Sequence, residues 1–239
     1  MEPIRIRQAL KDLLKRDGAG LDLAHAALLI AREDYGDLEV PFYLKELDRW
    51  GALARANIGA SRNPHVIIDR LNFTLFDEVG LRGNVDNYYD PRNSYLNEVM
   101  DRRIGIPITL SLIYMEVAQR ANFPLEGVGL PGHFIISHRN SAVPLYIDPF
   151  HRGALLTTVR CQSLVKRTLG EHVLWEPQWL NPIGKIEILC RMLRNLKEVY
   201  TQASQPLKTI SVLERLLLIQ PGHRPDQEEY LKLYAQLYN

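Results

Sequence analysis

Cysteine is nearly absent from this sequence: among 239 residues it occurs only at Cys161 and Cys190. Two cysteines cannot build the multiple disulfides of a small secreted scaffold, and they lack the close spacing of a structural zinc site. Both lie in apolar, helix-like stretches, so the pattern predicts buried free thiols. We therefore expect no disulfide framework, no metal and no cofactor.

Long hydrophobic runs and an excess of one charge are also lacking. No stretch approaches the roughly 20 apolar residues of a membrane span, and charges interrupt the first 20 residues, where a signal peptide would be apolar. The 29 basic and 28 acidic residues leave a formal net charge of +1, which gives no electrostatic reason to propose nucleic acid or an anionic membrane as a partner. We expect a cytoplasmic protein that binds neither.

The hydrophobic content of 46% is enough for one large domain or for one domain with an appendage. Apolar residues at helical spacing predict a helical N-terminal region over 1–79. Residues 80–94 are rich in Gly, Asn and Asp and predict a loop, and a loop of that length inside a compact domain is often functional.

From Pro107 the pattern predicts a buried helix, because proline suits the first helical position and residues 108–117 are apolar on nearly every side. Short β-rich segments follow and predict a small antiparallel sheet that ends near residue 157. Helical pattern then resumes, and residues 181–239 resemble a tetratricopeptide-like helical hairpin. The chain should thus be α+β, with a helical region over 1–79, a core over 80–180 and a helical tail over 181–239.

Three groups in the predicted core suggest a site: Pro107 at the tip of the buried helix, His133 where a strand begins, and Asp148 at the end of the next strand. A papain-type hydrolase has this order, with a cysteine at the helix tip, a histidine base, and an aspartate that orients the histidine. We expect His133 and Asp148 to lie within hydrogen-bond reach, about 2.6–3.2 Å. Alternatively, His133 bonds a backbone carbonyl and Asp148 only caps an Asp-Pro turn.

The string DPRNSYLNEVMDRRIGIPITLSLIYMEVAQRANFPLEGVGLPGHFIISH, followed by YIDPF, resembles the SirB1 family of transglutaminase-like proteins, and the similarity spans residues 20–220. The resemblance implies a papain/transglutaminase-like core, a buried helix on a small antiparallel sheet. Active members of the superfamily use a Cys-His-Asp triad. His133 and Asp148 match the histidine and aspartate, whereas Pro107 occupies the cysteine position and has no nucleophilic atom.

Other residues could replace the missing thiol. Thr109 and Ser111 follow on the same helix, but an unactivated hydroxyl is a weak nucleophile at neutral pH. Cys161 is a further alternative, although its apolar helical setting favours burial.

The loop over 87–97 combines tyrosine, asparagine and serine in a mixture that suits a recognition surface. The residues predicted to bind a ligand are Tyr89, Asn93, Ser94, Tyr95, Asn97, Thr109 and His133. The alternative is an ordered loop that covers the core. Arg102 and Arg103 are expected to fix this loop through carboxylates such as Asp90 or Asp101.

The leading hypothesis is a non-catalytic transglutaminase-like protein, a regulatory module that binds a protein or peptide through the vestigial cleft or the helical tail. The alternative is a hydrolase or transferase of altered mechanism, in which His133 and Asp148 act without a cysteine. The SirB1 name also reflects a proposed link to transcriptional regulation, but the near-zero net charge argues against direct DNA contact.

Overall fold

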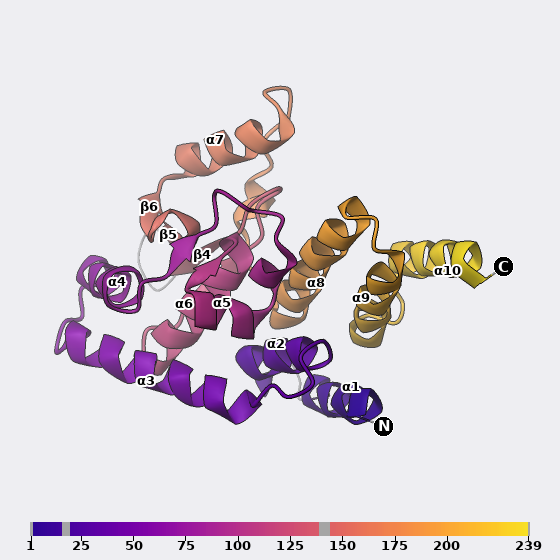
Figure 1. Cartoon of the computed structure of the whole chain (residues 1–239). Coiled ribbons are helices and arrows are strands. Elements are labelled where there is room, and N and C mark those ends of the chain that lie inside the picture. Colours follow the sequence, from indigo (N-terminus) through magenta and orange to yellow (C-terminus); the bar gives the residue numbers. More distant parts are fainter. Residues whose placement is uncertain (1, 16–19, 139–143, 239) are drawn as a thin grey trace.

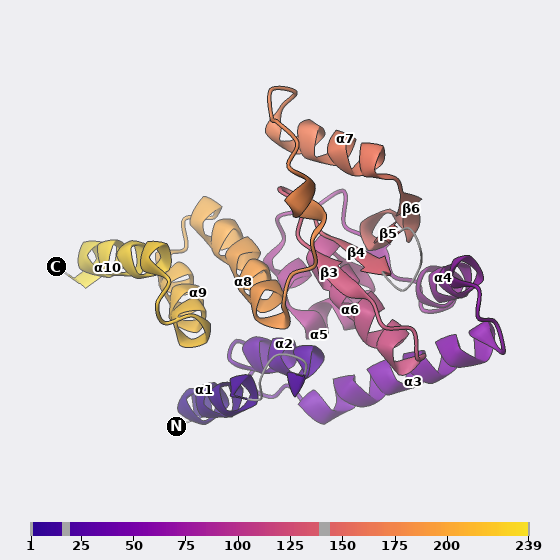
Figure 2. The same cartoon turned by 180° about the vertical axis from the view of Figure 1, so that it is seen from behind.

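The computed structural model describes residues 2–15, 20–138 and 144–238. A small sheet lies in the middle of the molecule, with helices around it and a helical C-terminal part that extends to one side (Figures 1 and 2). The predicted α+β class is confirmed.

The helices are α1 (Glu2–Leu14), α2 (Leu23–Arg32), α3 (Val40–Ile58), α4 (Pro64–Asn72), α5 (Leu96–Arg102), α6 (Pro107–Arg120), α7 (Thr158–Leu169), α8 (Lys185–Gln202), α9 (Pro206–Ile219) and α10 (Arg224–Tyr238). The strands are β1 (Arg82–Gly83), β2 (Ile104–Gly105), β3 (Glu126–Val128), β4 (Ile135–His138), β5 (Leu145–Asp148) and β6 (Ala154–Leu156). Short non-α turns are η2 (Phe73–Glu78), η3 (Pro91–Ser94), η4 (Pro149–His151) and η5 (Pro177–Leu180).

The N-terminal helices start at residues that cap them. The Asp22 side chain accepts a hydrogen bond from a backbone N–H in the first turn of α2, and Asn63 does the same for α4. Such caps satisfy backbone donors that a helix start leaves free. Pro64 then occupies the first turn of α4, where its missing N–H costs nothing.

Helix α6 is the buried centre of the fold. Almost all of its side chains are enclosed, and Tyr114 is fully buried. The helix packs against α3, β4 and α8, so it has no solvent face that would require polar residues. The prediction of a buried helix beginning at Pro107 is confirmed.

The main sheet is antiparallel in the order β3-β4-β5-β6, and its two faces pack on different partners. Ile136 of β4 pairs with Ile147 of β5, and both belong to the large core cluster that includes α6. The opposite face, with Ile135 and Tyr146, belongs to a smaller cluster with Cys161 of α7. Helix α7 therefore closes the side of the sheet that faces away from α6 (Figure 1).

A second sheet consists of β1 and β2, which pair in parallel on either side of the loop. The sequence predicted only a loop over 80–94, but the segment contains β1 and η3. A two-residue strand is too short to show an alternating pattern in the sequence. Its pairing also depends on a partner strand about 20 positions away, which local sequence does not reveal.

The C-terminal helices α8 and α9 pack into the same hydrophobic core as the rest of the fold. Arg215 of α9 is buried, and its guanidinium lies 3.4 Å from the Glu33 carboxylate and 2.5 Å from that of Asp34, just after α2. One core cluster includes residues from all three predicted segments, and the division at 79 and 180 stays a prediction.

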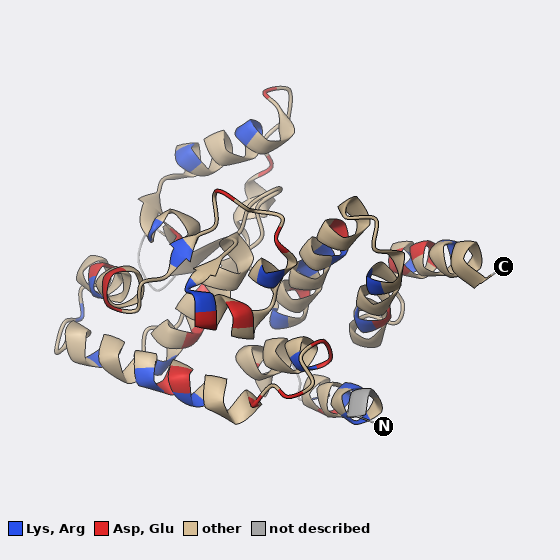
Figure 3. Cartoon of the chain, in the orientation of Figure 1, with Lys and Arg blue, Asp and Glu red and all other residues tan. Residues whose placement is uncertain are grey.

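Most helices, α3 and α10 included, carry both basic and acidic residues, whereas the charged residues of α7 are all basic (Figure 3). None of the helices that the structure describes combines the length and the apolar character that a membrane span requires.

Candidate functional site

His133 and Asp148 form the predicted pair. His133 Nε2 lies 2.9 Å from Asp148 Oδ2, so the pairing prediction is confirmed. The sheet register explains the contact: Ile136 faces Ile147, so Asp148 falls opposite Ile135, and His133 lies two residues before it on the same face. Diagonal neighbours on one face are within side-chain reach.

His133 precedes β4 by two residues and does not begin the strand as predicted. The turn before it contains Gly132 at φ +70, a left-handed conformation that favours glycine. A Cβ at this position would also lie 2.2 Å from Thr168 of α7, so only glycine allows α7 to pack this closely. The turn holds the imidazole outside the ladder, where it is 9% exposed.

A second histidine, His151, shares the carboxylate of Asp148. His151 Nδ1 lies 2.7 Å from the same Oδ2 atom, and its side chain is 52% exposed. The other oxygen, Oδ1, accepts hydrogen bonds from the backbone N–H groups of Phe150 and His151 at 3.1 and 3.4 Å. The predicted Asp-Pro cap thus exists together with the histidine contact, because each oxygen serves one of the two roles.

The electrostatics of this cluster favour an ionised carboxylate. Asp148 is 1% exposed, and burial alone would raise the pKa of its carboxyl. Hydrogen bonds and charge from His133 and His151 outweigh the burial, so the pKa of Asp148 lies below its ordinary value. The carboxylate can therefore orient an imidazole at neutral pH.

A cavity of about 570 Å³ opens beside His133, within the usual range for ligand pockets. It lies between the loop before η3, the tip of α6, the start of β4, and helices α7 and α8. Its walls are formed by Tyr88, Tyr89, Pro107, Ile108, Gly132, His133, Phe134, Phe150, His151, Leu164, Arg167, Thr168, Arg191, Asn195 and Glu198. The imidazole and the tip of the buried helix therefore face one space, as the triad layout requires.

Pro107 is the first residue of α6 and lines this cavity, so the helix tip presents a pyrrolidine ring, which has no nucleophilic atom, to the space that His133 faces. The alternative hydroxyls do not take its place. Thr109 Oγ1 accepts from Ile106 N–H at 3.2 Å and lies 2.9 Å from the carbonyl oxygen of Asn93, to which it donates. Ser111 is fully buried and does not line the cavity.

Neither cysteine lies at the cavity. Cys161 and Cys190 are fully buried free thiols, as predicted. Burial, together with the charge of Asp148, raises the pKa of Cys161 to about 11, and burial raises that of Cys190 to about 12. Thiols with such pKa values are protonated at neutral pH and are poor nucleophiles.

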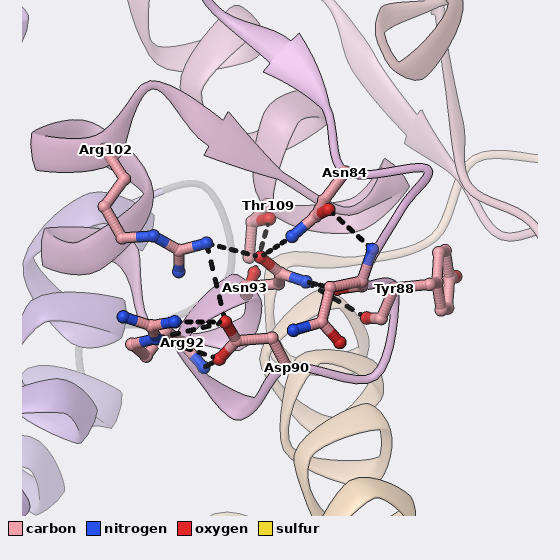
Figure 4. Close-up of polar contacts among 8 residues, drawn as sticks. Asn84, Tyr88, Asp90, Arg92, Asn93, Arg102 and Thr109 are labelled. Atoms are coloured by element: carbon pink, nitrogen blue, oxygen red, sulfur yellow. Dashed lines mark hydrogen bonds and ion pairs between the residues drawn. The ribbon is translucent and has the colours of Figure 1, made fainter.

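The loop over 84–95 is held by buried asparagine hydrogen bonds (Figure 4). Asn93 is fully buried; its side-chain amide donates to the carbonyls of Asn87 and Tyr88 at 2.8 and 3.1 Å. Asn84 donates to the Asn93 side-chain oxygen at 3.0 Å, and Thr109 fixes the Asn93 carbonyl from the tip of α6. The Tyr88 ring points away from this network (Figure 4) and lines the cavity.

Of the two arginines predicted to fix the loop, Arg102 does so and Arg103 does not. Arg102 lies 3.7 Å from the Asp90 carboxylate, an ion pair that fixes the loop as predicted. Arg92 forms a closer pair with Asp90 at 2.7 Å, and its hydrogen bonds lower the pKa of that carboxyl despite burial. Arg103 differs from the prediction: its guanidinium stacks 4.5 Å from the centre of the Trp50 ring.

Of the residues predicted to bind a ligand, Tyr89 and His133 line the cavity, and Tyr89 is 58% exposed. The others are buried and do not line it: Asn93, Ser94, Tyr95, Asn97 and Thr109. Tyr95, for example, bonds Asp34 and Tyr200 at 2.9 Å each. The structure places these five side chains beneath the surface and not in the cavity wall.

Several cavity residues were not predicted. His151 had a signal in the sequence, the spacing Asp-Pro-Phe-His, which returns the histidine to its aspartate within one tight turn. Arg167, Arg191 and Glu198 carried no local signal, because helices α7 and α8 bring them to the cavity only through tertiary packing. Arg191 also donates to the carbonyls of Gly129 and Leu130 at 2.8 and 2.7 Å and supports the turn before His133.

Comparison with known proteins identifies the family of this chain. The family model described as the transglutaminase-like superfamily matches residues 42–194. A UPF0162 protein of Xylella fastidiosa is 35% identical over 93% of this chain and 86% of its own length. A UPF0162 protein of Pseudomonas aeruginosa is 32% identical over 97% of this chain and 83% of its own length. Mouse F-box only protein 21 is 32% identical over 72% of this chain but only 28% of its own length.

No solved structure matches significantly. The family match includes the helix tip, the histidine and the aspartate described above, and the UPF0162 relatives align with nearly the whole chain. This chain therefore belongs to the transglutaminase-like superfamily, and within it to the UPF0162 proteins.

Proposed function

We propose that this chain is a non-catalytic transglutaminase-like protein that binds a protein or peptide segment in the cavity beside His133. One observation supports the proposal: an open cavity is lined by both His133 and the first residue of α6, and that residue is Pro107. An imidazole without a thiol beside it has no enzyme nucleophile to activate.

The walls of the cavity suit a peptide. Tyr88, Tyr89 and Phe150 offer aromatic surface, and aromatic side chains are enriched at recognition surfaces. Arg167 and Glu198, both exposed, add charges of opposite sign from α7 and α8. A segment with an apolar side chain and hydrogen-bonding groups can therefore be held from three sides.

To test this, peptides that bind the purified chain are selected from a displayed peptide library, and their affinity is then measured by fluorescence anisotropy. Tyr89→Ala removes an exposed cavity residue and should weaken binding at least about 5-fold, the effect of a substantial interface contact. Tyr234→Ala, an exposed tyrosine on α10 that does not line the cavity, is the matched control and should bind like wild type. Equal affinity of the two variants would refute the cavity as the binding surface.

A second candidate is a hydrolase or transferase of altered mechanism. The favouring observation is that His133 is oriented by Asp148 and faces a cavity large enough for a substrate, so it could deprotonate a water or a substrate hydroxyl. Turnover of peptide or amide substrates that His133→Ala abolishes would establish this candidate and exclude the non-catalytic one.

A further inference from the structure

The cluster at His133 contains three atoms that are metal ligands in other proteins. His133 Nε2, His151 Nδ1 and a carboxylate oxygen of Asp148 all lie within 4.8 Å of one another. Within the part of the chain that the structure describes, it is the one group in which three histidine, cysteine or acidic side chains lie close enough to bind the same ion. Its two imidazoles and one carboxylate form the ligand set common to zinc sites and to other first-row transition metals.

The local chain fixes these donors in place. The backbone N–H groups of Phe150 and His151 hold Asp148 Oδ1, which leaves Oδ2 toward the two imidazoles. Arg191 bonds the His133 carbonyl at 3.3 Å. Residues that orient ligands in this way are a regular part of metal sites.

The two nitrogen–oxygen distances require little adjustment. The two nitrogens lie 2.9 and 2.7 Å from Asp148 Oδ2. Ligands about 2.0–2.1 Å from a tetrahedral zinc ion are separated by roughly 3.3 Å, so each contact must lengthen by about half an ångström. The His151 side chain is half-exposed and has room to move. Binding would require the proton of each imidazole to sit on the other ring nitrogen, Nδ1 of His133 and Nε2 of His151, and any second proton would be released to solvent.

We propose that His133, Asp148 and His151 form a three-ligand site for a divalent first-row transition metal such as Zn²⁺. Asp148 closes the site from the buried side, whereas both histidines line the cavity. The remaining coordination position therefore opens toward the cavity, where it takes an oxygen donor, either water or a carbonyl or carboxylate of a bound molecule. The site goes beyond the proposed peptide binding and does not depend on it.

The test titrates metal-free protein with Zn²⁺ by calorimetry and with Co²⁺ by visible absorption. Wild type should bind one equivalent, and Co²⁺ should give the intense visible bands of low coordination number. His151→Ala should weaken Zn²⁺ binding at least 10-fold, since it removes a direct ligand and even supporting residues give losses of about 10–100-fold. The variant should fold, because the side chain is 52% exposed.

His223→Ala is the matched control. His223 Nδ1 lies 2.6 Å from Asp226 Oδ2, the same kind of contact, but without a third donor among the described residues. This variant should bind Zn²⁺ like wild type. In NMR spectra of the wild type, Zn²⁺ should shift the imidazole nitrogens of His133 and His151 and leave those of His223 in place. No saturable binding, or equal affinity in the two variants, would overturn the proposal.

Discussion

Substituting Pro107 with cysteine should place a reactive thiol at the tip of α6. The position is the first residue of the helix and lines the cavity together with His133. A free thiol has a pKa of about 8.5, and a helix N-terminus with a neighbouring imidazole lowers it to about 3.5–7.5. At the upper end of that range the thiolate fraction at pH 7 rises from about 3% to about 24%, roughly eightfold.

The assay is the rate of iodoacetamide alkylation as a function of pH. Lower basicity reduces intrinsic reactivity, so at a pKa of about 7.5 the net gain in rate at pH 7 is only about threefold, and at lower pKa values it is smaller still. The midpoint of the profile is therefore the better readout. We expect Pro107→Cys to have its midpoint at or below about pH 7.5. The native cysteines should add little background, because both are buried.

The control is Pro107→Cys combined with His133→Ala, whose midpoint should move back toward that of a free thiol. Proline to cysteine at a first helical position should cost about 0.4–1 kcal/mol, so the variant should fold. A midpoint near pH 8.5 that His133→Ala leaves unchanged would refute the assignment of Pro107 to the triad position.

Three further outcomes are expected. Asn93→Ala should lower the free energy of unfolding by about 1–3 kcal/mol in urea denaturation, because the buried Asn93 side chain loses its hydrogen bonds to the carbonyls of Asn87 and Tyr88 and each is worth about 0.5–1.5 kcal/mol; an unchanged midpoint would contradict the role given to this amide. The depressed pKa of Asp148 means that its stabilising contribution is complete above about pH 4 and is lost as the pH falls through the folded-state value. The free energy of unfolding of Asp148→Asn should therefore fall less steeply with decreasing pH than that of wild type. Parallel profiles of the two proteins would count against the stabilising contact between Asp148 and the histidines. Cys161 and Cys190 should resist a thiol reagent at pH 8 until the chain is unfolded, and fast native labelling of Cys161 would show that it is accessible.

Local chemistry made much of the fold predictable. Pro107 before an all-apolar run marks the start of a buried helix, and Asp148 before a proline marks the end of a strand. The pairing of His133 with Asp148 was also predictable, since adjacent antiparallel strands bring the two residues to one face.

The loop shows where sequence reasoning stops. Its composition predicted a surface for recognition, yet Asn93 and Thr109 are buried. The Asn93 amide bonds backbone carbonyls of its own loop, and the Thr109 hydroxyl bonds the carbonyl of Asn93 from helix α6. Amide and hydroxyl side chains serve equally well at a surface or inside a turn, and only tertiary contacts decide between the two. Tyr89, on the same loop, remains at the cavity.

The fate of a bound peptide tests the central claim most directly. A peptide selected for cavity binding is incubated for hours with the purified chain, with and without an added primary amine, and its mass is then measured. We predict full recovery at the original mass from both wild type and His133→Ala. A cleaved, deamidated or amine-coupled peptide from wild type alone would contradict the claim that the cavity binds without turnover.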